Sequence, residues 1–158
     1  CINPGFVLGD FLNEKTSTSM EYAKQLLQGK YPAAPKFSVM ISHVKDVAKA
    51  HVLSLSNKKA GGRRLIVGSE VRSILELSKI MAKNIPSHAK KLPKRELPNF
   101  MVKLISYIDT SAKTMVPDLG LKMQTDQTYA EDILQIKFTA SEIAVVDAAK
   151  SLIRLNLA

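Results

Sequence analysis

The sequence predicts an α/β fold with parallel strand pairing, and two observations support this. Short apolar, β-branched segments are separated by longer segments with helical periodicity, and only about three strands can be counted. Strands joined through helices favour parallel pairing with right-handed crossovers. The strands are expected within residues 1–10, 37–44 and 63–69.

Four segments carry the signature of a helix start. In each, a Ser or Thr is followed three residues later by Glu, which is the spacing of a capping box. The pairs are Thr18 with Glu21, Ser73 with Glu76, Thr128 with Glu131, and Thr139 with Glu142. A fifth helix is expected to begin at Asp46, whose carboxylate suits a capping position.

Apolar periodicity and breakers set the expected helix ranges. Gly29 should end the first helix, and Pro86 follows the third. The helix after Pro98 should place Phe100, Leu104 and Ile108 on one apolar face. The predicted ranges are 19–28, 47–55, 74–84, 98–108 and 140–155, with a shorter helical piece over 112–119.

Three parallel strands make a thin sheet with an uncovered edge. The chain also opens directly on a strand, CINPGFVLGD, without an initiator methionine. We therefore expect residues 1–158 to be one half of a larger fold, with the neighbouring strands in a preceding segment.

The charge balance favours anionic partners. The chain has 23 basic and 14 acidic side chains, for a net charge of +9. Its densest basic run, residues 88–97, contains no aromatic side chain on which a base could stack. Nucleic acid is therefore a disfavoured partner, and a solvated basic loop is the simpler interpretation.

Composition also limits the class of protein to which the chain can belong. Hydrophobic residues make up 46% of the chain, which is typical of a globular domain with a core. No apolar run reaches the roughly 18 residues of a spanning helix, so no membrane partner is expected. The single Cys1 fits a reducing cytoplasm. Three scattered histidines lack ligand spacing, so no metal site is predicted.

Several segments, taken in order, resemble a known family. They are INPGFVLG, STSMEYAKQLLQGKYP, SHVKDVAKAHVLSL, GGRRLIVGSE, SILELSKIMAKNIP and KMQTDQTYAEDILQIKFTASEIAVVDAAKSLI. Together they resemble the C-terminal half of an extended short-chain dehydrogenase/reductase of the NAD-dependent epimerase/dehydratase superfamily. Within it the dihydroflavonol-reductase-like and cinnamoyl-CoA-reductase-like group is most similar. The resemblance implies the C-terminal part of a Rossmann-like parallel sheet plus a mostly helical substrate-binding lobe.

The resemblance also implies where a cofactor and a substrate would lie. The strand end at Pro4, Gly5, Phe6 and Val7 would border the nicotinamide ring of NADP or NAD, with backbone groups binding its carboxamide. Ser17, Thr18 and Ser19 would lie in a loop that reaches the cofactor. The candidate substrate contacts are Phe6, Leu8, Phe11, Leu12 and Met40, and each of these also suits an ordinary core position.

The parts of the family that perform the chemistry are absent from this sequence. There is no Gly-rich strand-to-helix turn for a pyrophosphate. No Tyr is followed four residues later by Lys, so the family's proton donor is missing and no catalytic residue is assigned; His43 is not counted as one. The implied partners are an N-terminal dinucleotide-binding half and a small carbonyl substrate, such as an aldehyde, a ketone or a flavonoid-like ketone. The sequence leaves open whether the protein forms a homodimer.

Two other functions remain as alternatives. The chain could be a basic, non-catalytic module that retains only this half of the fold and binds a protein through its open sheet edge. The other alternative is nucleic-acid binding through the excess of Lys and Arg side chains. The isolated chain is expected to be inactive as a reductase and to bind NADPH weakly or not at all.

Overall fold

The computed structural model describes residues 1–12, 17–107, 113 and 116–158. Its strands are β1 (Ile2–Pro4), β2 (Phe6–Leu8), β3 (Ala34–Pro35), β4 (Ser38–His43), β5 (Leu65–Val67), β6 (Val71–Ser73) and β7 (Glu96–Leu97). Its α-helices are α1 (Thr18–Leu27), α2 (Val44–Ser56), α3 (Ile74–Asn84), α4 (Asn99–Ile105), α6 (Thr128–Leu134) and α7 (Ser141–Arg154). Two short 3-10 helices are η1 (Lys58–Ala60) and η2 (Val116–Asp118).

The predicted α/β class is confirmed, and most strand pairs are parallel. β1 pairs with β5, β2 with β4, and β3 with β7, all in parallel. β4 and β6 are antiparallel, which the prediction of parallel pairing did not include. The hydrogen bonds of this pairing begin directly after β5: the amide of Ser69 donates to the carbonyl of Ile41 at 2.8 Å, and the amide of Ile41 donates to the carbonyl of Glu70 at 3.1 Å.

Glycines lie next to strand ends at two places in the sheet, and one of them splits the strand predicted within residues 1–10. β1 becomes β2 at Gly5, and residues 68–70 separate β5 from β6, which lies outside the strand predicted at 63–69. Both glycines lie against β4. A Cβ on Gly5 would overlap the carbonyl oxygen of Met40, and a Cβ on Gly68 would lie 2.9 Å from the carbonyl oxygen of Ile41. Only glycine allows the two chain segments to cross β4 this closely.

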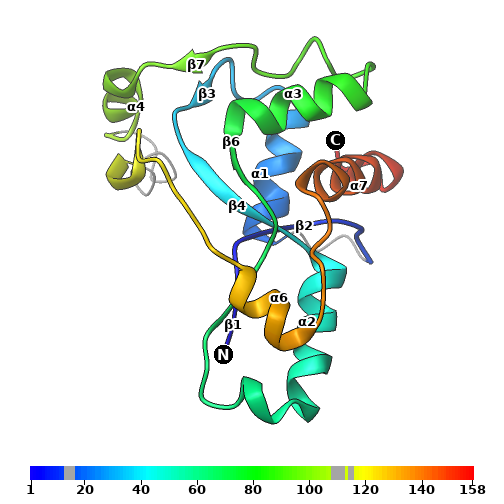
Figure 1. The fold of residues 1–158 in the computed structure, drawn as a ribbon. Helices are drawn as coiled ribbons and strands as arrows, with labels where there is room; N and C mark the ends of the chain where they lie inside the picture. The colour runs from blue at the N-terminus through cyan, green and yellow to red at the C-terminus, as the bar shows by residue number, and fades with distance from the viewer. Residues whose placement is uncertain (13–16, 108–112, 114–115) are drawn as a thin grey trace.

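The core has two parts on either side of this crossing. In the upper part of Figure 1, α1, α3 and α7 pack together over β2 and β4, with Leu26, Leu77 and Leu152 almost fully buried. In the lower part, α2 and α6 cover β1 and β5. At about 1.5–3 kcal/mol for each fully buried large side chain, this burial is the main favourable term for the fold.

The capping predictions have mixed outcomes. Ser73 and Glu76 form the full capping box at the start of α3. A hydrogen bond from the Ser73 amide lowers the pKa of Glu76, and the nearby Arg72 lowers it further. Partial burial of Glu76 acts in the opposite direction but is outweighed. At α1 the cap is Ser17 rather than Thr18, which is already helical.

Two further capping boxes do not form, because the caps come from elsewhere. Thr128 is the first residue of α6, and its amide donates to Asp126 at 2.9 Å. Thr139 lies before α7, and its hydroxyl donates to Asp46 at 3.1 Å. Asp46 therefore does not cap α2. His43 does, through its ring.

The helix ranges agree within a few residues, but one predicted apolar face is exposed. Phe100 and Leu104 are 71% and 68% exposed on α4, and Val102 is the residue that α4 buries. Ile108 and most of the predicted helical piece at 112–119 lie outside the described residues; the part that is described, Val116–Asp118, is a 3-10 turn.

Candidate functional site

The candidate site is built around the hydroxyl of Ser42, in the middle of the strand crossing. The Gly5 amide donates to Ser42 Oγ at 2.9 Å, and Ser42 Oγ donates to the carbonyl of Val67 at 2.6 Å. Ser42 is fully buried. One side chain therefore joins the end of β1, the end of β5 and the central strand β4.

These contacts bring the carboxyl ends of two parallel strands together. Pro4 and Val67 are partners in the register of β1 and β5, and both are the last residues of their strands. In open parallel sheets, ligands bind in the crevice beyond such strand ends. The crossing therefore places the Pro4–Gly5 step where a ligand site is expected.

The Pro4–Gly5 step has few free donors. Pro4 has no N–H, and the amide of Gly5 is used by Ser42. This step therefore offers a ligand no free amide donor, and only its carbonyl oxygens could accept a hydrogen bond from a ligand.

His43 ends β4 as a buried structural residue. Its Nδ1 accepts from the amide of Lys45 at 3.1 Å, which caps α2. In the neutral ring Nε2 therefore carries the proton, and it faces Asp147 Oδ2 on α7 at 3.3 Å. His43 is only 3% exposed, so it orders the end of β4 and does not face a ligand.

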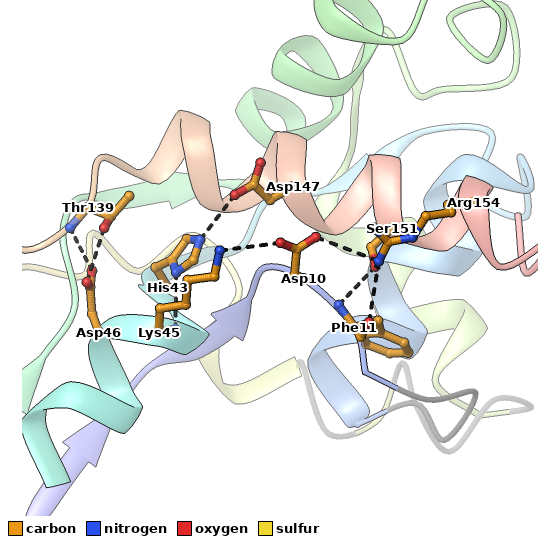
Figure 2. A network of polar contacts seen from close by, with 9 residues as sticks. All are labelled: Asp10, Phe11, His43, Lys45, Asp46, Thr139, Asp147, Ser151 and Arg154. Atoms are coloured by element: carbon orange, nitrogen blue, oxygen red, sulfur yellow. Dashed lines mark hydrogen bonds and ion pairs between the residues drawn. The ribbon is translucent and has the colours of Figure 1, made fainter. Parts of the chain in front are cut away.

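The loop after β2 is fastened to α7 and α2 (Figure 2). The amide of Phe11 donates to Ser151 Oγ at 2.9 Å, and Ser151 also accepts from Arg154 at 3.1 Å. The carboxylate of Asp10 lies 3.4 Å from Lys45 Nζ and 3.9 Å from Arg154 Nη2. These ion pairs are exposed and contribute about 0–1 kcal/mol each, so the buried hydroxyl of Ser151 is the stronger anchor.

The start of α7 is held from two other elements. Asp46 Oδ2 accepts from the amide of Thr139 at 2.6 Å, and a Glu70 carboxylate oxygen accepts from the amide of Ser141 at 2.8 Å (the first contact appears in Figure 2). Partial burial raises the pKa of Glu70, but hydrogen bonds from Ser141, from its own amide and from Ser69 outweigh it, so the net pKa is lowered. The start of the helix that anchors the loop is thus itself fixed to α2 and to the connection between β5 and β6.

The structure brings some of the predicted site residues together and separates others. Phe6 is half-buried and meets Tyr22 edge-on with ring centroids 6.1 Å apart. Leu8 and Met40 are buried at 1% and 6% exposure, as core residues are. Phe11 is partly buried, whereas Leu12 is 99% exposed at the end of the anchored loop.

The second predicted cofactor segment lies at the start of α1. Ser17 and Thr18 are exposed and Ser19 is partly buried. Ser17 Oγ accepts from the amide of Met20 at 3.4 Å, so its hydroxyl is already engaged as a helix cap. The linking residues 13–16 lie outside the described part of the chain.

Sequence reasoning missed the residues that organise the site. Ser42, Ser151, Asp147 and Arg154 were not singled out. A lone hydroxyl within the apolar run VMIS was the available signal for Ser42, because a polar group in a buried strand needs a partner. The anchors on α7 are more than 130 residues from Phe11 and carry no local signal.

No protein-family model matches the chain. It is 32% identical over 87 residues to tetraketide alpha-pyrone reductase 2 of Arabidopsis thaliana, and 35% identical over 86 residues to cinnamoyl-CoA reductase CAD2 of Medicago truncatula. Each match covers about half of this chain, 55% and 54%, and 27% and 26% of the relative. Yeast methylglyoxal/isovaleraldehyde reductase Gre2, solved with NADPH, superposes with a TM-score of 0.72 at 18% identity. That superposition covers 98% of this chain and 43% of Gre2.

The resemblance to the extended short-chain dehydrogenases/reductases is confirmed. The likeness to Gre2 extends over nearly the whole chain and shows the reductase fold. The chain spans less than half the length of Gre2, and the matched segments span about a quarter of the curated reductases.

None of the helices in the described part is long and apolar enough to cross a membrane. Among those same residues, no group of three or more His, Cys, Asp and Glu side chains is placed to hold a metal ion.

Proposed function

We propose that this chain is the substrate-side half of an NAD(P)-dependent oxidoreductase that reduces a carbonyl group. The substrate would be an aldehyde, a ketone or a flavonoid-like ketone. The observation that carries the proposal is the Pro4–Gly5 crossing at the carboxyl ends of β1 and β5, within a chain that has the fold of a reductase solved with NADPH. A lone cysteine fits a reducing cytoplasm as the place of action.

The proposed partner is a dinucleotide-binding half that continues the sheet. In the described residues β1 pairs only with β5, which leaves its other edge available for a further parallel strand. That half would supply the Gly-rich grip on the cofactor and the Tyr and Lys that transfer the proton. No residue of this chain is assigned a catalytic role.

The cofactor, when bound, would supply the hydride. Pro4, Gly5, Phe6 and Val7 would form the wall beside the nicotinamide. The Gly5 amide is held by Ser42, so this wall would bind chiefly through carbonyl oxygens and the backbone of Phe6 and Val7. Ser17–Ser19 begin α1, whose N-terminal amides and partial positive charge suit a phosphate of the cofactor.

The substrate would contact the loop after β2. Leu12 is fully exposed at its end, and Phe11 is held by Ser151 and Arg154. An apolar side chain placed on a fixed loop can select a substrate by shape, which is worth about 1–3 kcal/mol per methylene-sized difference. Leu8 and Met40 would support this wall from the core rather than contact the substrate.

The test is a titration of NADPH followed by the cofactor's own emission, since the chain contains no Trp. It compares residues 1–158 alone with a longer polypeptide that includes the upstream coding sequence. We expect the longer polypeptide to bind in the micromolar range and the isolated chain to bind weakly or not at all. Micromolar binding by the isolated chain, or an upstream sequence without Tyr-x-x-x-Lys and a Gly-rich turn, would overturn the proposal in favour of a non-catalytic binding module.

A further inference from the structure

Helix α2 has a buried side and a second, exposed apolar side. Asp46 and Ala50 are its buried residues, and Ala50 belongs to the lower core. Ala48 is exposed, and Val52 and Leu55 are 66% and 88% exposed. Their spacing of four and three residues places these three on one face of the helix, which we call the outer stripe. At about 100° per residue, position 48 lies about 200° around the helix from position 46, so the outer stripe faces away from the core.

The outer stripe is unusual for a helix face in contact with water. A surface helix normally turns one apolar face to the core and polar side chains to solvent. Single exposed apolar residues are common, but three in line over two turns form a face. The polar residues Lys49 and His51 lie on either side of this face, and the ring of His51 is held by the carbonyl of Val47, with Nδ1 at 2.8 Å. The pattern is that of a helix packed between two elements.

The sheet beneath α2 has a free edge. α2 packs on β1 and β5, which are neighbouring parallel strands, and α2 lies in the connection between them (Figure 1). Within the described residues, β1 pairs with β5 on one edge and with no strand on the other. A further strand could therefore join the sheet beside β1, next to the position of α2.

The handedness of crossover connections fixes where the helix of such a strand would lie. A strand that runs parallel to β1 on its free edge and leads into β1 needs a crossover, usually a helix. That crossover advances across the sheet in the same direction as the connection from β1 to β5. Because both are right-handed, their helices lie on the same face of the sheet. The added helix is then the neighbour of α2, with the two axes about 8–10 Å apart.

We propose that the outer stripe is the surface on which a crossover helix of the dinucleotide-binding half docks. This inference rests on the proposed function, which supplies that half. This chain covers 43% of Gre2, so more than half of that reductase lies beyond the superposed part. The docked helix presents an apolar face, since the outer stripe offers only hydrocarbon groups. Ala48, the smallest of the three residues, marks the point of closest approach.

The test measures the reactivity of thiols placed on the outer stripe, in the longer polypeptide that includes the upstream coding sequence. The variants are Val52→Cys and Leu55→Cys, and the control is Lys79→Cys, an exposed position on α3 in the upper part of the molecule. N-ethylmaleimide modification is followed by peptide mass spectrometry, which separates each introduced thiol from Cys1. The rate in the native protein is divided by the rate in urea, so that intrinsic reactivity cancels.

We expect modification at positions 52 and 55 to be slowed at least about tenfold by folding, and at position 79 by less than about threefold. The protection should be the same from about 1 to 100 μM protein, because the docked helix belongs to the same polypeptide. Equal protection at all three positions would overturn the proposal. Protection that is lost on dilution would also overturn it, because the occupant would then be a second copy of the chain.

A second pair of variants tests the close approach at Ala48. Ala48→Phe should lower the urea midpoint of the longer polypeptide by at least about 0.3 M, because the ring would overlap the docked helix. Lys79→Phe places the same ring on an exposed helix and should shift the midpoint by less than about 0.1 M. Equal shifts would contradict docking at Ala48.

An assay of NADPH oxidation with a carbonyl substrate, on the same longer polypeptide, separates this inference from the proposed function. Protected thiols at positions 52 and 55 without any reductase activity would refute the proposed function and leave the docking surface standing. Reductase activity with unprotected thiols would overturn the docking surface alone.

Discussion

The amide of Gly5 and the hydroxyl of Ser42 are 2.9 Å apart and join the first strand of the chain to the central one. The same hydroxyl donates to the carbonyl of Val67. The segments that contain Gly5 and Val67 are therefore both tied to the side chain of one fully buried serine on β4. The geometry of the proposed nicotinamide wall depends on this single side chain.

Replacing Ser42 by Ala should destabilise the chain. The substitution leaves the buried Val67 carbonyl without this donor and the Gly5 amide without this acceptor, at a cost of about 1–3 kcal/mol in the free energy of unfolding. Urea denaturation followed by far-UV circular dichroism measures the change. Ser54→Ala is the matched control, because Ser54 Oγ only donates to Ala50 within α2 and its loss should cost less than about 0.5 kcal/mol. Equal losses at the two serines would show that Ser42 does not link β4 to Gly5 and Val67.

Gly5 should tolerate no Cβ. In Gly5→Ala the added methyl would overlap the carbonyl oxygen of Met40, which is backbone of a central strand and cannot turn aside. We expect a loss of about 1–3 kcal/mol in unfolding free energy. The control is Gly61→Ala, where the nearest atom to the new Cβ, the Lys58 carbonyl oxygen, would be 3.3 Å away and the backbone is extended. A Gly5→Ala chain as stable as the parent would mean that β1 and β2 do not cross β4 this closely.

The loop that ends in Leu12 should loosen when its anchor on α7 is removed. Ser151→Ala deletes the acceptor of the Phe11 amide, which should then exchange its hydrogen at least about tenfold faster, since local opening no longer breaks that bond. NMR measures the hydrogen-exchange rate of each backbone amide, including that of Phe11. Ser106→Ala, whose hydroxyl donates only to the nearby carbonyl of Lys103, is the control and should leave Phe11 unchanged. Protection of Phe11 that persists in Ser151→Ala would contradict the anchoring role.

The capping box of α3 should give a pH-dependent stability. Hydrogen bonds from Ser73 and the nearby Arg72 lower the pKa of Glu76 in the folded state below its ordinary value of 4.5. A carboxyl group whose pKa is depressed stabilises the fold above its unfolded pKa, and that contribution is lost as the pH falls through the folded pKa. The stability difference between the parent and Glu76→Gln should therefore be constant near neutral pH and shrink below about pH 4.5. Urea midpoints at a series of pH values measure it, and a difference that grows on acidification would have the wrong sign.

The helices and the fold class were accessible from sequence because their signals are local. The range of α3 is as predicted, and Gly29, with a φ of +77°, ends α1 as its position indicated. The crossing at Gly5 and Gly68 was not accessible, because it depends on β4, more than twenty residues away from either glycine. The antiparallel pairing of β6 with β4 was not accessible for the same reason.

The contacts of the candidate site were harder to predict for a related reason. Thr139 carries a capping-box pattern, but Asp46, far away in sequence, takes both its amide and its hydroxyl. His43 caps α2 in place of Asp46 because its ring reaches the amide of Lys45. Long-range partners override local propensity at these positions, and spacing alone carries no information about them.

The measurement that tests the central claim most directly is carbonyl-dependent oxidation of NADPH by the longer polypeptide, by its upstream half alone and by residues 1–158 alone. Isovaleraldehyde, named for Gre2, is a suitable first substrate. If this chain is the substrate-side half of a reductase, only the longer polypeptide should consume NADPH, and only when the aldehyde is present. Full activity of the upstream half alone, or of residues 1–158 alone, would contradict the account.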